Sequence, residues 1–360
     1  MGICGSSQGG AFRKLYELDE KTVLSERRGA TVFRGRHRAS GALVAIKRVD
    51  KPMPQDAKSP SIPPHSLPPL QLTPPSSWEN EVAILQQCAG HKHIIAFRTA
   101  FEMPTHALLV MEYVEGGELF DALISDGAYS EWDAKRFVHD ILQALAFLHA
   151  RNIIHRDIKP ENLVFTSRDS KVASIKVVNF AMAKRVYHES TDGDDQLTWP
   201  YCAPEILASF GGLSSRSASR SASMAVNAHD TADTPVLPTS PPPVGVKCDM
   251  WSVGIVLYVL LSGAHPFDLD GRQPRDQIVG NILLGKFTMS DESPVWRQIS
   301  SEAKDFLRKL LQVDPEKRLS AEEALAHKWF MAPDTPRSPL SVSVSDGLGQ
   351  YQRLMRKKFR

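Results

Sequence analysis

The sequence predicts an α+β protein with two lobes, in which a strand-rich lobe precedes a larger helical one. Apolar residues at 31–35 and 42–49, on either side of a turn at Ser40-Gly41, predict a pair of antiparallel strands. Within 131–150, apolar residues recur at helical spacing and predict a long amphipathic helix. Of the 360 residues, 42% are hydrophobic and 23% charged, which is enough apolar material for a sizeable core.

Further elements follow the same reasoning. A helix is predicted at 78–87 and an apolar strand at 108–113, which complete the first lobe. The remaining helices are predicted at 249–262, 275–284, 301–311 and 320–327.

Two segments have compositions that do not suit a packed core. Residues 51–77 contain nine prolines, and residues 209–246 contain eight serines and five prolines. Both are expected to be inserts. The expected organisation is an N-terminal segment at 1–14, a first lobe at 15–113, a second lobe at 114–332, and a basic flexible tail at 333–360.

Charge and cysteine usage exclude several classes of protein. Lys and Arg number 43 against 41 for Asp and Glu, a balance that argues against binding nucleic acid by bulk charge. Cys4, Cys88, Cys202 and Cys248 are far apart, so neither a zinc site nor a disulfide framework is indicated, and a reducing cytosol fits. The longest apolar run, 250–261, is shorter than the ~20 residues of a membrane-spanning helix.

The segment from His155 to Asn162 reads HRDIKPEN and matches H-R-D-x-K-P-x-N at every fixed position. On this motif the chain resembles the eukaryotic protein kinases. Supporting motifs in the same order are Val44-Ala45-Ile46-Lys47, Ala203-Pro204-Glu205, Asp249 to Gly254 and the DPEKR segment that ends at Arg318. The segments ENEVAIL at 79–85, GGELF at 116–120 and AKDF at 303–306 are most similar to the calcium/calmodulin-dependent serine/threonine group.

The resemblance implies the bilobal kinase fold and transfer of the γ-phosphoryl group of ATP to a hydroxyl group. In this reading Lys47 holds the α- and β-phosphates, and Glu81 holds Lys47 in place. Asp157 accepts the substrate proton, Lys159 steadies the transferred group, and Asn162 binds Mg²⁺ or Mn²⁺.

The resemblance implies further roles around these residues. For adenine it implies a gate at Met111, hinge backbone bonds from Glu112 to Val114, and enclosure by Val32, Ala45 and Val164. For the fold it implies a stack of Leu85, His155 and Phe180, an ion pair of Glu205 with Arg318, and Asp249 at the start of the central helix of the second lobe. For the activation segment it implies that Thr198 contacts the catalytic Asp and Lys, and that Ser190 or Thr191 is a phosphorylation site paired with Arg156.

The metal-binding motif departs from the family pattern. Where the family has D-F-G, this chain has Asn179-Phe180-Ala181. Asn179 retains a carbonyl oxygen but no negative charge, and Mg²⁺ prefers anionic oxygens. If the lost carboxylate is worth about 4 kcal/mol, turnover is ~10³ slower, so metal binding is expected to be weakened or dispensable.

The loop that covers the phosphates departs as well. Ser25, Arg27 and Ala30 stand where the family has its three glycines, and their side chains should hinder the approach of backbone N–H groups to phosphate. Two readings of Arg27 are open. Its guanidinium either lies over the phosphates or points to solvent.

Glu118 and Glu161 stand where relatives that prefer basic substrates meet an arginine of the substrate, which implies a preference for R-x-x-S/T. Arg216 with Ser219, and Arg220 with Ser223, have this spacing inside the second insert. These serines are either autophosphorylated or modified by other kinases.

The first residues, MGICGS, match the acylation pattern, with myristate expected on Gly2 and reversible palmitate on Cys4. One myristoyl chain binds membrane only marginally, so a second signal is needed, either Cys4 or the basic residues at 353–360. The expected location is the cytoplasmic face of a membrane, with a cytosolic pool. The tail is interrupted by prolines and Gly347, so no autoinhibitory helix is expected. A brief basic helix at 350–360 would serve membrane contact, or, less readily, calmodulin.

Two functions from different classes remain open. The first is a serine/threonine kinase with weak or metal-atypical turnover. The second is a pseudokinase that scaffolds or activates partner proteins. The intact HRDIKPEN segment favours the enzyme, whereas Asn179 and the degenerate phosphate loop favour the scaffold.

Overall fold

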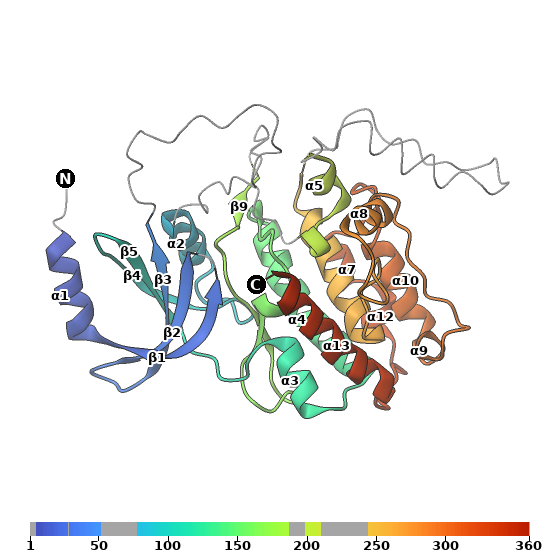
Figure 1. Cartoon of the computed structure of the whole chain (residues 1–360), viewed down its shortest axis with the longest axis horizontal. Coiled ribbons are helices and arrows are strands. Elements are labelled where there is room, and N and C mark those ends of the chain that lie inside the picture. The colour runs from blue at the N-terminus through green and yellow to red at the C-terminus, as the bar shows by residue number, and fades with distance from the viewer. Residues whose placement is uncertain (1–4, 28, 52–77, 187–198, 210–243, 360) are drawn as a thin grey trace. The chain divides into compact units, whose positions relative to one another are not determined.

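The structure is a computed structural model (Figure 1), which describes residues 5–27, 29–51, 78–186, 199–209 and 244–359. These residues divide into two compact units.

The N-terminal unit runs through Glu115 and also takes in Asn179–Ala183. The C-terminal unit consists of Gly116–Val178 and the described residues from Lys184 onward. The two units are described separately below.

The N-terminal unit is an antiparallel sheet with two helices. The strands follow the order β1-β2-β3-β5-β4, and every neighbouring pair is antiparallel. The elements are α1 (Gly5–Leu15), β1 (Tyr16–Arg27), β2 (Ala30–His37), β3 (Leu43–Asp50), α2 (Trp78–Gln87), β4 (Phe97–Glu102) and β5 (His106–Glu112).

Alternation along the strands produces the core of this unit. Val44 and Ile46 of β3 are fully buried, as the period of two in a strand requires. Phe12 of α1 belongs to the same core cluster, and its ring lies edge-on to Phe101 with centroids 5.3 Å apart. The sequence placed residues 1–14 outside the core, and this was wrong for helix α1, because burial of Phe12 fixes the helix against the sheet.

The C-terminal unit is mainly helical. Its helices are α3 (Leu119–Asp126), α4 (Glu131–His149), α5 (Pro204–Ser209), α7 (Lys247–Ser262), α8 (Arg275–Leu283), α9 (Pro294–Arg297), α10 (Ser301–Leu310), α11 (Ala321–Leu325), α12 (Lys328–Met331) and α13 (Val342–Phe359). Two small antiparallel ladders pair β6 (Ile153–Ile154) with β9 (Lys184–Arg185) and β7 (Leu163–Phe165) with β8 (Ile175–Val177), and 3₁₀ turns lie at Pro160–Asn162 and Trp199–Tyr201.

Helix α7 forms the centre of this unit. Every residue from Cys248 to Leu261 is buried, and α4, α10 and α13 all contact the helix. The long apolar run of the sequence is therefore core. Among the described helices, none has the length and hydropathy of a membrane span.

Local signals fix the ends of the long helices. Ser130 caps α4, and its hydroxyl accepts a bond from the N–H of Asp133 while the Asp133 carboxylate accepts from the N–H of Ser130. Helix α7 ends at Ser262 and is capped by Gly263, which has a φ of 73°, a conformation that glycine adopts without strain.

The expected flexible tail at 333–360 is wrong. Helix α13 spans 18 residues and packs on α3 and α7 (Figure 1). Glycine inside a helix costs about 1 kcal/mol, but Val344, Leu348, Tyr351 and Met355 are buried along one face of α13 and offset that cost. Gly347 is also needed for the contact, because a Cβ there would lie 2.8 Å from the carbonyl oxygen of Gly263.

Candidate active site

Lys47 and Glu81 form a buried ion pair in the N-terminal unit. Lys47 Nζ lies 2.7 Å from both carboxylate oxygens of Glu81, and the two side chains are only 5% and 2% exposed. Strand β3 supplies the lysine and helix α2 the glutamate. This is the pairing that the sequence predicted, and it holds the ammonium group in one place.

Asn179 is bound to the same ammonium group. Lys47 Nζ donates to Asn179 Oδ1 over 3.1 Å. Asn179 has a φ of 64°, in the left-handed region that Asn and Asp tolerate better than most residues. The amide oxygen that remains in place of the family's carboxylate is thus used to accept a bond from the lysine.

Helix α2 also holds the segment that follows Asn179. Asn80 Nδ2 donates to the carbonyl oxygen of Ala183 over 2.9 Å, a contact that the sequence reasoning missed. Phe180 and Leu85 are 0% and 1% exposed, so both lie in the core as expected. Their stacking with His155 stays a prediction.

The residues assigned to adenine lie on β2, β3 and β5 or just after them. In the sheet register, Val32 is opposite Lys47, and Ala45 is opposite Met111. The N–H of Glu112 donates to the carbonyl oxygen of Ala96 over 2.8 Å. That N–H can donate to a nucleotide only by breaking this bond. The carbonyl oxygen of Glu112 and the backbone of Val114 are the hinge groups that remain for adenine, so the expected hinge bonds stay a prediction.

The degenerate phosphate loop is the turn between β1 and β2. The strands remain paired up to Arg27 and Ala30, and Gly29 in the turn has a φ of 75°. Gly29, which lies next to the expected glycine positions, therefore takes the positive φ that the turn requires. The Arg27 side chain is half-buried, and its placement over phosphate stays a prediction.

In the C-terminal unit, Asp157 is held by two side chains. Lys159 Nζ lies 2.7 Å from Asp157 Oδ1, and Asn162 Nδ2 donates to Asp157 Oδ2 over 2.7 Å. Asn162 Nδ2 also donates to the backbone oxygen of Asp157 over 2.6 Å. The predicted catalytic triplet is thus assembled in one place, with Asp157 8% exposed. Val164 follows it on β7.

Asp249 fixes the loop that carries Asp157. Its carboxylate accepts bonds from the N–H groups of His155 and Arg156 over 2.9 and 2.8 Å. Burial raises the pKa of Asp249, but its hydrogen bonds, above all the one from His149, outweigh burial and lower the pKa below its usual value. The resulting anion holds Arg156 at a φ of 65°.

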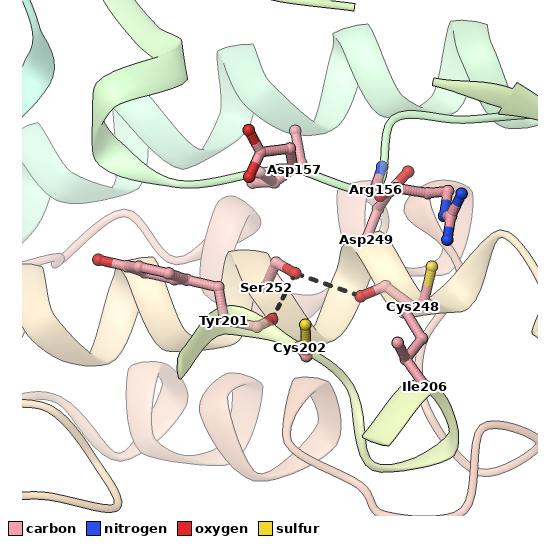
Figure 2. Close-up of a pocket in the computed structure, with 9 residues that line it drawn as sticks. Arg156, Asp157, Tyr201, Cys202, Ile206, Cys248, Asp249 and Ser252 are labelled. Carbon is pink, nitrogen blue, oxygen red and sulfur yellow. Dashed lines mark hydrogen bonds between the residues drawn. The ribbon is translucent and has the colours of Figure 1, made fainter. Parts of the chain in front are cut away.

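A small pocket lies beside Asp157, on the side of α7 (Figure 2). Ser252 Oγ donates to the carbonyl oxygen of Tyr201 over 2.8 Å and so ties the segment before α5 to helix α7. Burial raises the pKa of the Cys202 thiol to about 12, and it also raises the pKa of the Cys248 thiol. Both thiols therefore stay protonated at neutral pH and are poor nucleophiles.

Glu205 and Arg318 form a second fully buried ion pair. Arg318 Nη1 and Nη2 donate to the two carboxylate oxygens over 2.7 and 2.9 Å, and both side chains are at most 1% exposed. This is the two-point pairing that arginine makes with a carboxylate. The predicted pair is confirmed.

Helix α13 covers Glu118, one of the two residues that were assigned to substrate binding. Arg356 Nη2 is paired with Asp121 and lies 3.5 Å from Glu118 Oε2. Gln352 Nε2 donates to Asp121 over 2.8 Å, and the hydroxyl groups of Tyr351 and Tyr201 are 2.7 Å apart. Sequence reasoning missed Asp121, Tyr201 and the part of this helix before residue 350. The helical spacing of the buried residues is the signal that would have revealed it: Val344, Leu348, Tyr351 and Met355.

Several predicted sites lie outside the described residues. These are the lipidation sites Gly2 and Cys4, the threonine Thr198, and the phosphorylation sites Ser190, Thr191, Ser219 and Ser223. Glu161, the second predicted substrate contact, lies in the 3₁₀ turn at Pro160–Asn162.

The N-terminal unit suits the phosphates of a nucleotide but not a metal ion at position 179. Lys47 presents a fixed cation, whereas Asn179 offers one neutral oxygen that already accepts from Lys47. No group of three His, Cys, Asp or Glu residues arranged to hold a metal occurs in the part of the chain that the structure describes.

A protein kinase domain model matches residues 21–226 and 235–330. The chain is 34% identical over 274 residues to a CDPK-related protein kinase of Daucus carota, an alignment that covers 76% of this chain and 39% of that protein. It is 30% identical over 348 residues to calcium-dependent protein kinase 12 of Oryza sativa subsp. japonica, covering 97% and 55%.

The similarity extends to a shorter relative. Calcium/calmodulin-dependent protein kinase type 1B of Rattus norvegicus is 32% identical over 334 residues, which cover 92% of this chain and 80% of the rat protein. The chain spans well under two thirds of the plant relatives' length.

Proposed function

The chain belongs to the protein kinase family, within its calcium/calmodulin-dependent group, and from that premise we propose that it transfers the γ-phosphoryl group of ATP to serine or threonine of proteins. The observation that carries the proposal is the catalytic loop, in which Lys159 and Asn162 both bind the carboxylate of Asp157. A chain that only scaffolds needs none of these contacts.

The residues divide the work as follows. Lys47, fixed by Glu81, places one positive charge against the α- and β-phosphates. Asp157 accepts the proton of the acceptor hydroxyl group, and its orientation is set by Asn162. Lys159 stabilises the charge on the transferred group.

Turnover is weak, or independent of the usual metal requirement, because of Asn179. In the family a divalent cation neutralises phosphate charge, and an amide whose oxygen is bound to Lys47 replaces one of its anionic ligands here. No step of the proposed mechanism depends on a metal at this position. If the missing stabilisation is about 4 kcal/mol, the rate is ~10³ lower than with a carboxylate.

A phosphotransfer assay on a basic peptide tests the proposal, with Mg²⁺, with Mn²⁺ and with chelator. We expect slow turnover that is abolished in Asp157→Ala. Turnover that never exceeds the Asp157→Ala background, under any metal condition, would contradict it.

The same assay addresses the second candidate, a pseudokinase that scaffolds or activates partners. Asn179 and the side chains in the β1–β2 turn favour it. Nucleotide binding measured by thermal shift, together with absent turnover, would establish this alternative.

We propose a preference for R-x-x-S/T substrates. Arg356 of the chain itself lies at the carboxylates of Glu118 and Asp121, which supports an arginine-binding role for this acidic pair. An Arg→Ala change in the peptide three residues before the acceptor should raise KM. Ser219 and Ser223 are the proposed autophosphorylation sites, and mass spectrometry after incubation with ATP, compared with Asp157→Ala, tests them.

Helix α13 is proposed to restrain the enzyme, because it covers Glu118 and binds Tyr201. Calmodulin is a proposed weak partner. Calmodulin could bind α13 only after the helix dissociates from the C-terminal unit, since Tyr351 and Met355 are buried there.

Myristoylation at Gly2 and palmitoylation at Cys4 are proposed as well, with location at the cytoplasmic face of a membrane and a cytosolic pool. The support is the MGICGS start of the chain. Co-expression with an N-myristoyltransferase, followed by intact mass measurement of the protein and of Gly2→Ala, tests the acylation.

A further inference from the structure

Helix α1 is firmly attached to the sheet of the N-terminal unit. The Phe12 ring packs against Tyr16 and Phe101, at centroid distances of 6.0 and 5.3 Å. Gln8 Oε1 accepts a bond from the N–H of Glu102 on β4. One face of α1 is therefore fixed against the sheet, and the helix lies beside β4 (Figure 1).

The C-terminal end of α1 is basic and partly apolar. Arg13 and Lys14 are exposed at the end of the helix, followed by Leu15, which is 46% exposed. The sequence of α1, GSSQGGAFRKL, contains no acidic residue. Basic side chains at the C-terminal end of a helix are also stabilised by its dipole.

The residue that follows strand β2 extends this basic surface. Arg38 Nε donates to the carbonyl oxygen of Arg13 over 2.8 Å, which places Arg38 directly beside the end of α1. Arg38 is also exposed. Glu17 lies 3.7 Å from Arg38 and neutralises part of the charge. We name Arg13, Lys14 and Arg38 the α1 basic surface.

We infer that the α1 basic surface binds an anionic lipid bilayer, next to the acyl chain. The inference rests on the proposed acylation of Gly2. Helix α1 begins at Gly5, so the acylated residue lies within about 10 Å of the start of the helix. An 11-residue helix is about 16 Å long. The proposed acylation site is therefore joined to the basic surface by a chain span of about 10 Å and the length of α1.

A myristoyl chain alone does not hold a protein at a membrane, so a second membrane contact is needed. A single myristoyl chain binds a bilayer with an association constant of only about 10⁴ M⁻¹. Each Lys or Arg near an anionic surface contributes about 1 kcal/mol, or about a fivefold gain. Three basic residues with Glu17 among them leave two net charges, so the combined gain is about 25-fold.

The C-terminal basic residues are less suited to this role. Arg356, the residue at their centre, is paired with Asp121 and Glu118 inside the C-terminal unit. Arg353 and Lys357 are exposed and provide a direct comparison.

Vesicle sedimentation of the acylated full-length protein tests the inference, with phosphatidylcholine alone and with added phosphatidylserine. Loss of two charges in Arg13→Gln/Lys14→Gln should weaken binding to the anionic vesicles by about 25-fold. Binding to phosphatidylcholine should stay unchanged. The matched control is Arg308→Gln/Lys317→Gln, which removes two exposed charges from the C-terminal unit and should bind like the parent. Lys14→Gln alone, with an unchanged circular dichroism spectrum, guards against misfolding and should lose about fivefold.

Two outcomes would overturn the inference. One is a loss for Arg13→Gln/Lys14→Gln that equals the control, and the other is a larger loss for Arg353→Gln/Lys357→Gln. If intact mass measurement shows no acyl group, the proposed acylation fails on its own. The surface is then judged with the unmodified protein at low salt: salt-sensitive binding to phosphatidylserine that requires Arg13 and Lys14 supports it, and no binding refutes it.

Discussion

The hydroxyl groups of Tyr201 and Tyr351 are hydrogen-bonded over 2.7 Å in the interior of the C-terminal unit. Tyr201 precedes helix α5, and Tyr351 lies on α13, 150 residues later. Burial raises the pKa of both phenols, so the two groups stay protonated at neutral pH and share the bond. This bond joins α13 to Tyr201, which lines the same small pocket as Asp157.

The first prediction concerns release of α13. Tyr351→Phe combined with Arg356→Ala removes two contacts worth about 1 kcal/mol each. The equilibrium between docked and released α13 then shifts toward the released helix by up to ~30-fold. We expect kcat/KM for a basic peptide to rise by about tenfold or more. Arg353→Ala on the exposed side of α13 is the control. Equal rates for all three proteins would show that α13 does not restrain the enzyme.

The second prediction concerns position 179. Asn179→Asp restores a carboxylate in a backbone conformation that Asp also tolerates. The activation barrier should fall by about 4 kcal/mol, so turnover should rise by up to ~10³-fold. Turnover should also become strictly dependent on Mg²⁺. Phosphotransfer measured across a Mg²⁺ titration checks this. Asn152→Asp, at another asparagine with positive φ, should leave the rate unchanged, and a flat metal response in Asn179→Asp would refute the idea.

Most of the fold follows from periodicity in the sequence. The long helix expected at 131–150 is α4 at Glu131–His149, and the strand pair at 31–35 and 42–49 becomes β2 and β3. These predictions are correct because one face of each segment is apolar and the local signals, such as the Ser130 cap, agree with the burial of that face.

Helix α13 was expected only at 350–360, because the prolines and Gly347 of the tail outweighed the helical spacing of the apolar residues from Val344 to Met355. The role of Gly347 is visible only in the folded structure, where it lets α13 approach Gly263 at the end of α7. The same holds for the bond from Lys47 to Asn179, since a substitution in a motif shows a lost carboxylate but not the new partner of the amide.

The third prediction concerns the buried ion pair of Glu205 and Arg318. Glu205→Ala leaves the Arg318 guanidinium buried without its carboxylate and should lower the free energy of unfolding by about 3–5 kcal/mol. Lys317 is paired with Asp314 at the surface, where its side chain is 75% exposed, so Lys317→Ala should change stability by less than about 1 kcal/mol. Urea unfolding of the three proteins measures both. Similar losses for the two variants would contradict the assignment.

The fourth prediction concerns acid sensitivity. Burial lowers the pKa of His155, His106 and His327 below the usual value of 6.5. As the pH falls, these histidines are protonated in the unfolded chain before they are protonated in the folded one. Their full contribution to the free energy of unfolding is therefore present above about pH 6.5 and is lost progressively below that pH. Urea midpoints at pH 7.5 and 5.5 should show the decrease, and replacement of the fully buried His155 by Phe should reduce the pH dependence. A midpoint that rises on acidification would refute this reading.

The last prediction concerns Asn80, which positions the segment behind Asn179. Its amide nitrogen bonds the carbonyl oxygen of Ala183, so Asn80→Ala removes a hydrogen bond worth about 1 kcal/mol. Because Lys47 binds the start of the same segment, the loss should reach the nucleotide phosphates. We expect ATP affinity, measured by calorimetry, to fall about fivefold. Glu79→Ala, one residue earlier on α2, is the matched control. Weakened unfolding stability in Asn80→Ala with unchanged ATP affinity would mean that Asn80 only holds the fold together.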